Sequence, residues 1–188
     1  MEHLDNFIFK WQNREVKVKI LEDLPEIKMF TISIGPFKKG EETNIPYWIA
    51  KILKKDKIID FLEEVEYDVE DLLKVKWKEQ ETPNIQIIGK EFYVKTKETI
   101  LNLIDELKEE DKFSINSQKL QKKERIQSLL KDIFARRIYK ILRIATQGHD
   151  QPKFLNSLTD EEALLYKHLR QIIKNWQNNF VEIDKKQT

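Results

Sequence analysis

The stretch NIPYWIAKILKKDKIIDF, residues 44–61, places a tryptophan and several large aliphatic side chains beside a run of lysines. Pro46 suits the first turn of a helix, where a backbone N–H has no partner within the helix. At helical spacing the large apolar residues share one face, and the lysines point away from it. These apolar residues are Trp48, Ile49, Ile52 and Leu53. We therefore predict a short amphipathic helix that covers a neighbouring element.

Three stretches before residue 44 have the apolar pattern of strands. The first is FIFKW at residues 7–11. The second is residues 16–20, where Val16, Val18 and Ile20 alternate with lysines. The third is residues 30–34, directly before Gly35. A sheet of three short strands buries too little apolar surface by itself. We expect the helix within residues 44–61 to cap this sheet.

The chain after residue 61 has mainly helical periodicity. An acidic passage, residues 60–71, leads into a helix predicted over 69–78. An extended piece lies between Pro83 and Gly89. Further helices are predicted from about Thr96, over 118–146, and after Thr159. Thr159 and Glu162 have the spacing of a capping box, which marks the start of the last helix. The helix over 118–146 would be about 40 Å long.

These patterns predict an α+β fold, in which a small β-rich N-terminal domain precedes a larger all-α helical bundle. We place the first domain at residues 1–61, capped by its short helix, and the second at residues 62–188, with long helices at an interface.

The composition indicates a soluble protein with a real core. Of the 188 residues, 40% are hydrophobic and 36% are charged, yet the net charge is only +1. The N-terminal residues lack the pattern of a signal peptide, and no apolar run is long enough for a membrane span, so we expect an intracellular location. The absence of cysteine and the abundance of Lys, Glu and Ile fit a thermophile, although an AT-rich genome also enriches Lys and Ile.

Catalytic chemistry has little support in the sequence. The histidines His3, His149 and His168 stand apart from each other at spacings that fit no metal site. Four glycines in all make a glycine-rich phosphate loop improbable. We expect no enzyme activity, no cofactor, no metal and no catalytic residue.

The long predicted helix carries a row of basic residues that has two interpretations. The row is Lys119, Lys122, Lys123, Arg125, Lys131, Arg136, Arg137, Lys140 and Arg143. Such a row could contact phosphates, or it could be a solvated helix face or form salt bridges to acidic neighbours. A net charge near zero argues against tight DNA binding by the chain alone.

The apolar stripes of the long helix and the last helix are wider than one small bundle needs, which favours an obligate oligomer over a monomer with a thick core. Candidate partner-binding residues are Leu130, Ile133, Phe134, Arg137, Ile138, Lys140, Ile141, Leu165, Leu169 and Ile172. Trp48, Ile49, Ile52 and Leu53 are candidates for anchoring the small domain.

The order of these pieces resembles a subunit of the GINS complex, of the archaeal type that carries its small β domain first. Pro46, Trp48, Ala50 and Leu53 occupy the family's P-x-W-x-A-x-x-L helix, which a short strand follows. Arg137, Lys140 and Ile141 match its R-x-x-K-I helix, and residues 156–166 resemble its capped last helix. Residues 82–96 depart from the family because they look more β-like than its usual linker.

The resemblance implies a replication factor without an active site. It implies a four-subunit assembly, in archaea two copies each of two related subunits, joined through their long helices. Its implied partners are a second GINS subunit, the MCM helicase, a RecJ-like protein and primase, with DNA contact weak or indirect. The implied location is the cytoplasm at the nucleoid, or the nucleus in a eukaryote. A free-standing regulator that binds nucleic acid through the long basic helix is the alternative.

Overall fold

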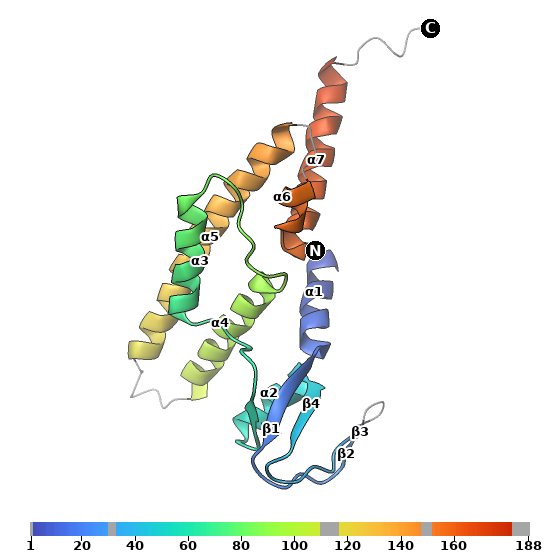
Figure 1. The fold of residues 1–188 in the computed structure, drawn as a ribbon, viewed down its shortest axis with the longest axis vertical. Helices are drawn as coiled ribbons and strands as arrows, with labels where there is room; N and C mark the ends of the chain where they lie inside the picture. The colour runs from blue at the N-terminus through green and yellow to red at the C-terminus, as the bar shows by residue number, and fades with distance from the viewer. Residues whose placement is uncertain (1, 30–32, 110–116, 148–151, 182–188) are drawn as a thin grey trace. The chain divides into compact units, whose positions relative to one another are not determined.

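The computed structural model describes residues 2–29, 33–109, 117–147 and 152–181. The chain divides into two compact units, residues 1–66 and 67–188. The first unit holds all the strands among the described residues, and the second is helical (Figure 1). The predicted α+β class, with a small β-rich part before a larger helical part, is confirmed.

The first unit is built on a three-stranded antiparallel sheet in the order β4-β1-β5. Its elements are α1 (Glu2–Asn13), β1 (Glu15–Ile20), β2 (Ile27–Lys28), β3 (Ser33–Ile34), β4 (Glu42–Pro46), α2 (Tyr47–Lys55) and β5 (Ile59–Phe61). Strand β1 lies in the centre and alternates as predicted: Val16, Val18 and Ile20 are buried. The lysines between them lie on the outer face, where Lys17 pairs with Glu42 at 2.7 Å.

Two of the predicted strands differ from the structure. Residues 7–11 belong to helix α1. Trp11 is buried, with its ring 5.7 Å from that of Tyr47, whereas Phe9, which a strand would place on the same face as Trp11, is exposed. Of the strand predicted at 30–34, Ser33 and Ile34 form β3, which pairs with β2 in a separate hairpin, and residues 30–32 lie outside the described part. Strands β4 and β5 complete the sheet instead.

Helix α2 begins directly after Pro46 and packs on the sheet, as predicted. Its buried side chains are Tyr47, Ile49, Ala50 and Leu53. Ile52, which we expected on this face, is 53% exposed, and Trp48 is only half-buried. Both lie about one residue's rotation, roughly 100°, from the face centred on Ile49 and Leu53. The expectation that Ile52 packs on the sheet was wrong, and Tyr47 is the buried aromatic residue of this helix.

The described residues of the second unit form four long helices and one short helix. They are α3 (Val69–Glu81), α4 (Phe92–Glu109), α5 (Ser117–Gln147), α6 (Pro152–Asn156) and α7 (Asp160–Val181). Helix α5 packs against α3, α4 and α7 (Figure 1). Its bounds lie within one residue of the predicted ones at each end.

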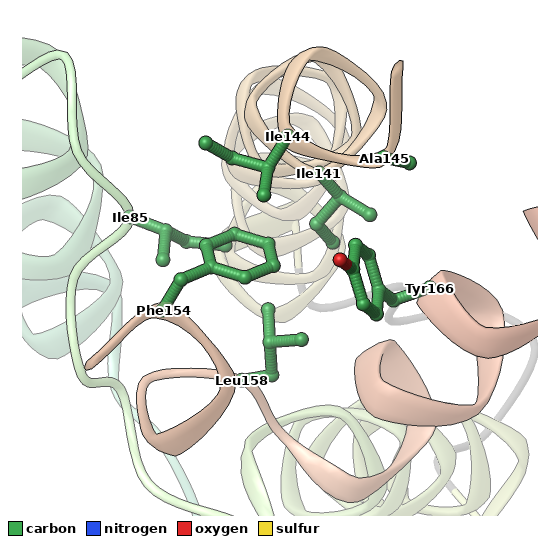
Figure 2. Packing of buried hydrophobic residues seen from close by; sticks show 7 residues of the cluster. All are labelled: Ile85, Ile141, Ile144, Ala145, Phe154, Leu158 and Tyr166. Atoms are coloured by element: carbon green, nitrogen blue, oxygen red, sulfur yellow. The ribbon is translucent and has the colours of Figure 1, made fainter. Parts of the chain in front are cut away.

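Helix α5 contributes to two separate hydrophobic cores. One joins it to α3 and α4 and contains Leu72, Phe92, Leu103, Ile126, Leu129 and Ile133. The other joins it to α6, α7 and Ile85, and contains Ile141, Ile144, Ala145, Phe154, Leu158 and Tyr166 (Figure 2). Arg137 and Lys140 lie between the two cores and are buried.

Polar side chains cap two of these helices. At α7, the backbone N–H of Glu162 donates to Thr159 Oγ1 at 3.2 Å, and the Thr159 N–H donates to Glu162 Oε2 at 3.0 Å. The predicted capping box is therefore confirmed. Asp68 and Asp71 make a second capping box at α3, where the backbone N–H of Val69 and an ion pair with Lys122 lower the pKa of Asp68.

Candidate functional site

Four of the ten candidate partner-binding residues lie inside the helical unit. Ile133, Arg137, Lys140 and Ile141 are all buried within it. The prediction that they form a binding surface was wrong. They continue one helical stripe with Ile126 and Leu129, and this stripe faces the chain's own core.

The other six candidates lie at or near the surface. Leu130, Ile138, Leu165 and Leu169 are half-buried, while Phe134 is exposed and Ile172 is 64% exposed. Trp176 and Phe180 on α7 are as exposed as Ile172, and their ring centroids lie 5.1 Å apart. The candidate surface therefore extends toward the end of α7.

Arg137 forms the centre of a buried charge network. Its Nε and Nη2 donate to the two carboxylate oxygens of Glu162 at 2.5 and 2.6 Å. Its Nη1 donates to Glu79 and to the Gln86 carbonyl, and Nη2 also reaches the Ser157 carbonyl at 3.3 Å. A paired fork of this kind is the strongest arrangement for a guanidinium and a carboxylate.

Lys140 extends the network by one helical turn. Its Nζ donates to the Glu79 carboxylate, to the Glu79 carbonyl at 2.9 Å and to the Asn84 carbonyl at 2.8 Å. The network thus contains two buried acids, Glu79 and Glu162, and two buried bases. Its charges balance within the unit, which is the condition under which charges can be buried without a large penalty.

The network also explains the segment between Pro83 and Gly89, which was expected to be extended and holds no strand. The carbonyls of Asn84 and Gln86 accept from Lys140 and Arg137, and the Gln86 N–H donates to Glu79 at 2.8 Å. Buried side chains therefore satisfy the backbone groups that a strand ladder would otherwise satisfy. The segment stays irregular, and α4 begins at Phe92 rather than near Thr96.

Buried charges perturb the groups around them. Burial alone would lower the pKa of the Arg137 guanidinium, but its hydrogen bonds to Glu162 and the charges of Glu162 and Glu79 raise it above its ordinary value. Tyr93 donates its hydroxyl to Glu162 at 2.7 Å. Burial, followed by the charge of Glu162, raises the pKa of Tyr93 well above its ordinary value. Arg137 therefore stays charged and Tyr93 stays neutral at physiological pH.

We predict that Tyr93→Phe reduces the loss of stability at alkaline pH. Since the folded pKa of Tyr93 is raised, its contribution is fully present below the unfolded pKa, about 10, and is lost as the pH rises above it. Urea unfolding between neutral pH and pH 11 should show a shallower decline for Tyr93→Phe than for the native chain. The exposed Tyr139→Phe is the control, and equal slopes for the two variants would contradict the prediction.

The basic row of α5 is not one continuous positive face. Arg137 and Lys140 are inside, Lys119 pairs with Glu106 at 3.1 Å, and Lys122 pairs with Asp68 at 3.2 Å. Lys76 of α3 binds Asp132, and this hydrogen bond and charge lower the pKa of Asp132. The structure therefore agrees with the second interpretation, pairing with acidic neighbours, for four of the nine basic residues.

The part of the chain that the structure describes offers little for metal chemistry or membrane insertion. No group of three or more His, Asp or Glu side chains in it could hold a metal ion, and His168 lies exposed on α7. None of its helices combines the length and apolar character needed to cross a membrane.

Taken together, these features define an α+β protein whose larger unit is a helical bundle. This bundle contains a network of buried charges and has exposed apolar side chains on its surface. Residues 66–181 match the family model described as the Sld5 GINS complex protein helical bundle domain. Because this match covers more than half of the chain, the chain belongs to the GINS complex protein family. No curated protein matches it.

The network was not foreseen, although the sequence contains its signal. Arg137 occupies a position in the apolar stripe four residues after Ile133 and four before Ile141. A charge at such a position must find buried partners. The sequence therefore indicates that Arg137 needs buried partners, but only the fold shows that these partners are Glu79 and Glu162.

Proposed function

We propose that this protein is a non-catalytic scaffold subunit of a GINS complex that supports the MCM replicative helicase, with a RecJ-like protein, in DNA replication. The proposal includes the archaeal type of subunit, a 2:2 assembly with a second GINS subunit, and a contact with primase. It also includes a location at the nucleoid, or in the nucleus in a eukaryote. The family match supports the assembly, and one feature of the surface indicates that the chain needs a partner subunit.

That feature is the apolar stripe of α7. Ile172, Trp176 and Phe180 recur every four residues along the second half of the helix, and Trp176 is 62% exposed. Single exposed apolar residues are ordinary on a protein surface, but a contiguous stripe with two aromatic rings is typical of an interface. We infer that a helix of the second subunit covers this stripe.

The assembly can be tested by native mass spectrometry of the tagged protein purified from its own cells at moderate salt. We expect a 2:2 complex with a second subunit of similar build, accompanied by helicase peptides. A lone monomer of 22.7 kDa would contradict the assembly.

A single charge on the stripe should prevent assembly without unfolding the chain. We predict that Trp176→Glu abolishes co-purification of the second subunit, because a buried unpaired carboxylate is costly in an interface. Asn178→Glu adds the same charge on the other side of α7, where the side chain is also exposed, and is the control. The melting temperature of each separated variant should stay near that of the native chain. Equal recovery of the partner with both variants would place the interface elsewhere.

The alternative, a free-standing nucleic-acid-binding regulator, has less support. Four of the nine basic residues of its row are buried or paired. A direct DNA binder would lose affinity with salt by about 0.9 log units per log unit of salt for each phosphate contacted. A flat salt dependence with weak binding agrees with the scaffold proposal.

A further inference from the structure

A second feature of the helical unit's surface is a groove lined by basic side chains. This groove of about 720 Å³ lies between the end of α3 and the middle of α5. Its lining includes Pro83, Ala135, Arg136, Tyr139 and Arg143. The last three share one side of α5, since they follow each other at spacings of three and four residues. The groove is separate from the apolar stripe of α7.

The acidic side chains that line this groove are already engaged. Glu79 is bound by Arg137 and Lys140, and Asp132 is bound by Lys76. Arg136 is exposed and has no ion pair with any described residue. The groove therefore has an excess of positive charge at Arg136 and Arg143, because Asp132, whose pKa the charge of Arg136 also lowers, already pairs with Lys76.

Arg143 is held in place beside the groove. Its Nη2 donates to the Pro83 carbonyl at 2.7 Å, which holds the side chain against the loop after α3. Its Nε is buried and has no hydrogen-bond partner among the described residues.

The chemistry of the groove is not purely ionic. Tyr139 lies between the two arginines and is 69% exposed, and Pro83 and Ala135 add apolar surface. A guanidinium binds a carboxylate through a planar fork of two hydrogen bonds. A fitting ligand therefore combines carboxylates with an aromatic or aliphatic group.

We propose that this groove binds a short acidic segment of a partner protein. Carboxylates of the segment engage Arg136 and Arg143, and an apolar side chain next to them packs on Tyr139 and Pro83. A nucleic acid fits less well, because its phosphates cannot use the apolar surface that Pro83 and Ala135 add beside the arginines.

The test is fluorescence anisotropy on the full chain at physiological salt, with a labelled peptide of sequence DDEFLDDE as the probe. We expect saturable binding, weakened about tenfold or more by Arg136→Gln combined with Arg143→Lys, because this pair loses one charge and one fork. Arg136→Gln alone should weaken binding several-fold. Since Arg136 is exposed and makes no ion pair with a described residue, this variant should keep the native melting temperature.

The control variant is Arg125→Gln combined with Lys131→Gln, two exposed residues of α5 outside the groove lining. It should change the affinity less than about twofold. Absence of saturable binding, or an equal loss in the control and groove variants, would overturn the proposal. Equal binding of DDESSDDE would overturn the apolar contact. Tighter binding of a thymidine oligonucleotide, lost with Arg136→Gln, would assign the groove to nucleic acid instead.

Discussion

Arg137→Met should destabilise the helical unit by about 3–5 kcal/mol, because it leaves buried carboxylates without their counter-charge. The side chain of Arg137 is fully buried, as are those of its partners Glu79 and Glu162. Methionine keeps much of the volume, so the loss comes from charge and hydrogen bonding rather than from a cavity. Urea unfolding followed by circular dichroism measures the change.

The neighbouring residue offers a matched control. Arg136→Met removes the same group one position earlier, where the side chain is exposed, and should change the free energy of unfolding by less than about 0.5 kcal/mol. Adding Glu162→Gln to Arg137→Met should restore part of the loss, because it removes one unpaired charge. If the two arginine variants unfold at the same urea concentration, the network does not stabilise the unit.

Tyr47→Ala should destabilise the first unit by about 3–5 kcal/mol, the range for a large buried aromatic side chain. Tyr47 is buried at the start of α2, and its ring lies 5.7 Å from that of Trp11 and 6.0 Å from that of Phe61. The substitution therefore leaves a cavity shared by α1, α2 and β5. Urea unfolding followed by tryptophan fluorescence measures the change, since two of the four tryptophans, Trp11 and Trp48, lie in this unit.

Two positions of the same helix show whether burial decides the effect. Ile52→Ala should cost less than about 0.5 kcal/mol, since the side chain is exposed. Trp48→Ala should fall between the two, because Trp48 is half-buried. If Ile52→Ala lowers the free energy of unfolding as much as Tyr47→Ala does, then α2 packs through the face that was predicted from the sequence.

Elements whose signals are local were predicted well. Helix α5 follows from a long run of apolar residues at helical spacing, and β1 follows from strict alternation. The capping box of α7 depends on Thr159 and Glu162, which are three residues apart. In each case the interacting groups are neighbours in the chain, so their spacing alone specifies the contact.

Other elements depended on residues that are distant in the sequence. Residues 7–11 have the pattern of a strand, but they belong to α1, in which Trp11 packs against Tyr47 and Phe9 is exposed. The irregular segment 82–91 is held by charges from α5, some fifty to sixty residues further along. The sequence pattern alone contains no information on which of several charged partners will be near.

The sequence by itself determined the two-part α+β class, the course of the long helix, the start of the last helix and the resemblance that the family match supports. The tertiary structure alone decided which apolar and basic residues of α5 face inward. Periodicity shows that residues share a face but does not show what covers that face. Arg137 and Lys140 were therefore expected at the surface, whereas the acids of α3 and α7 bring them into the core.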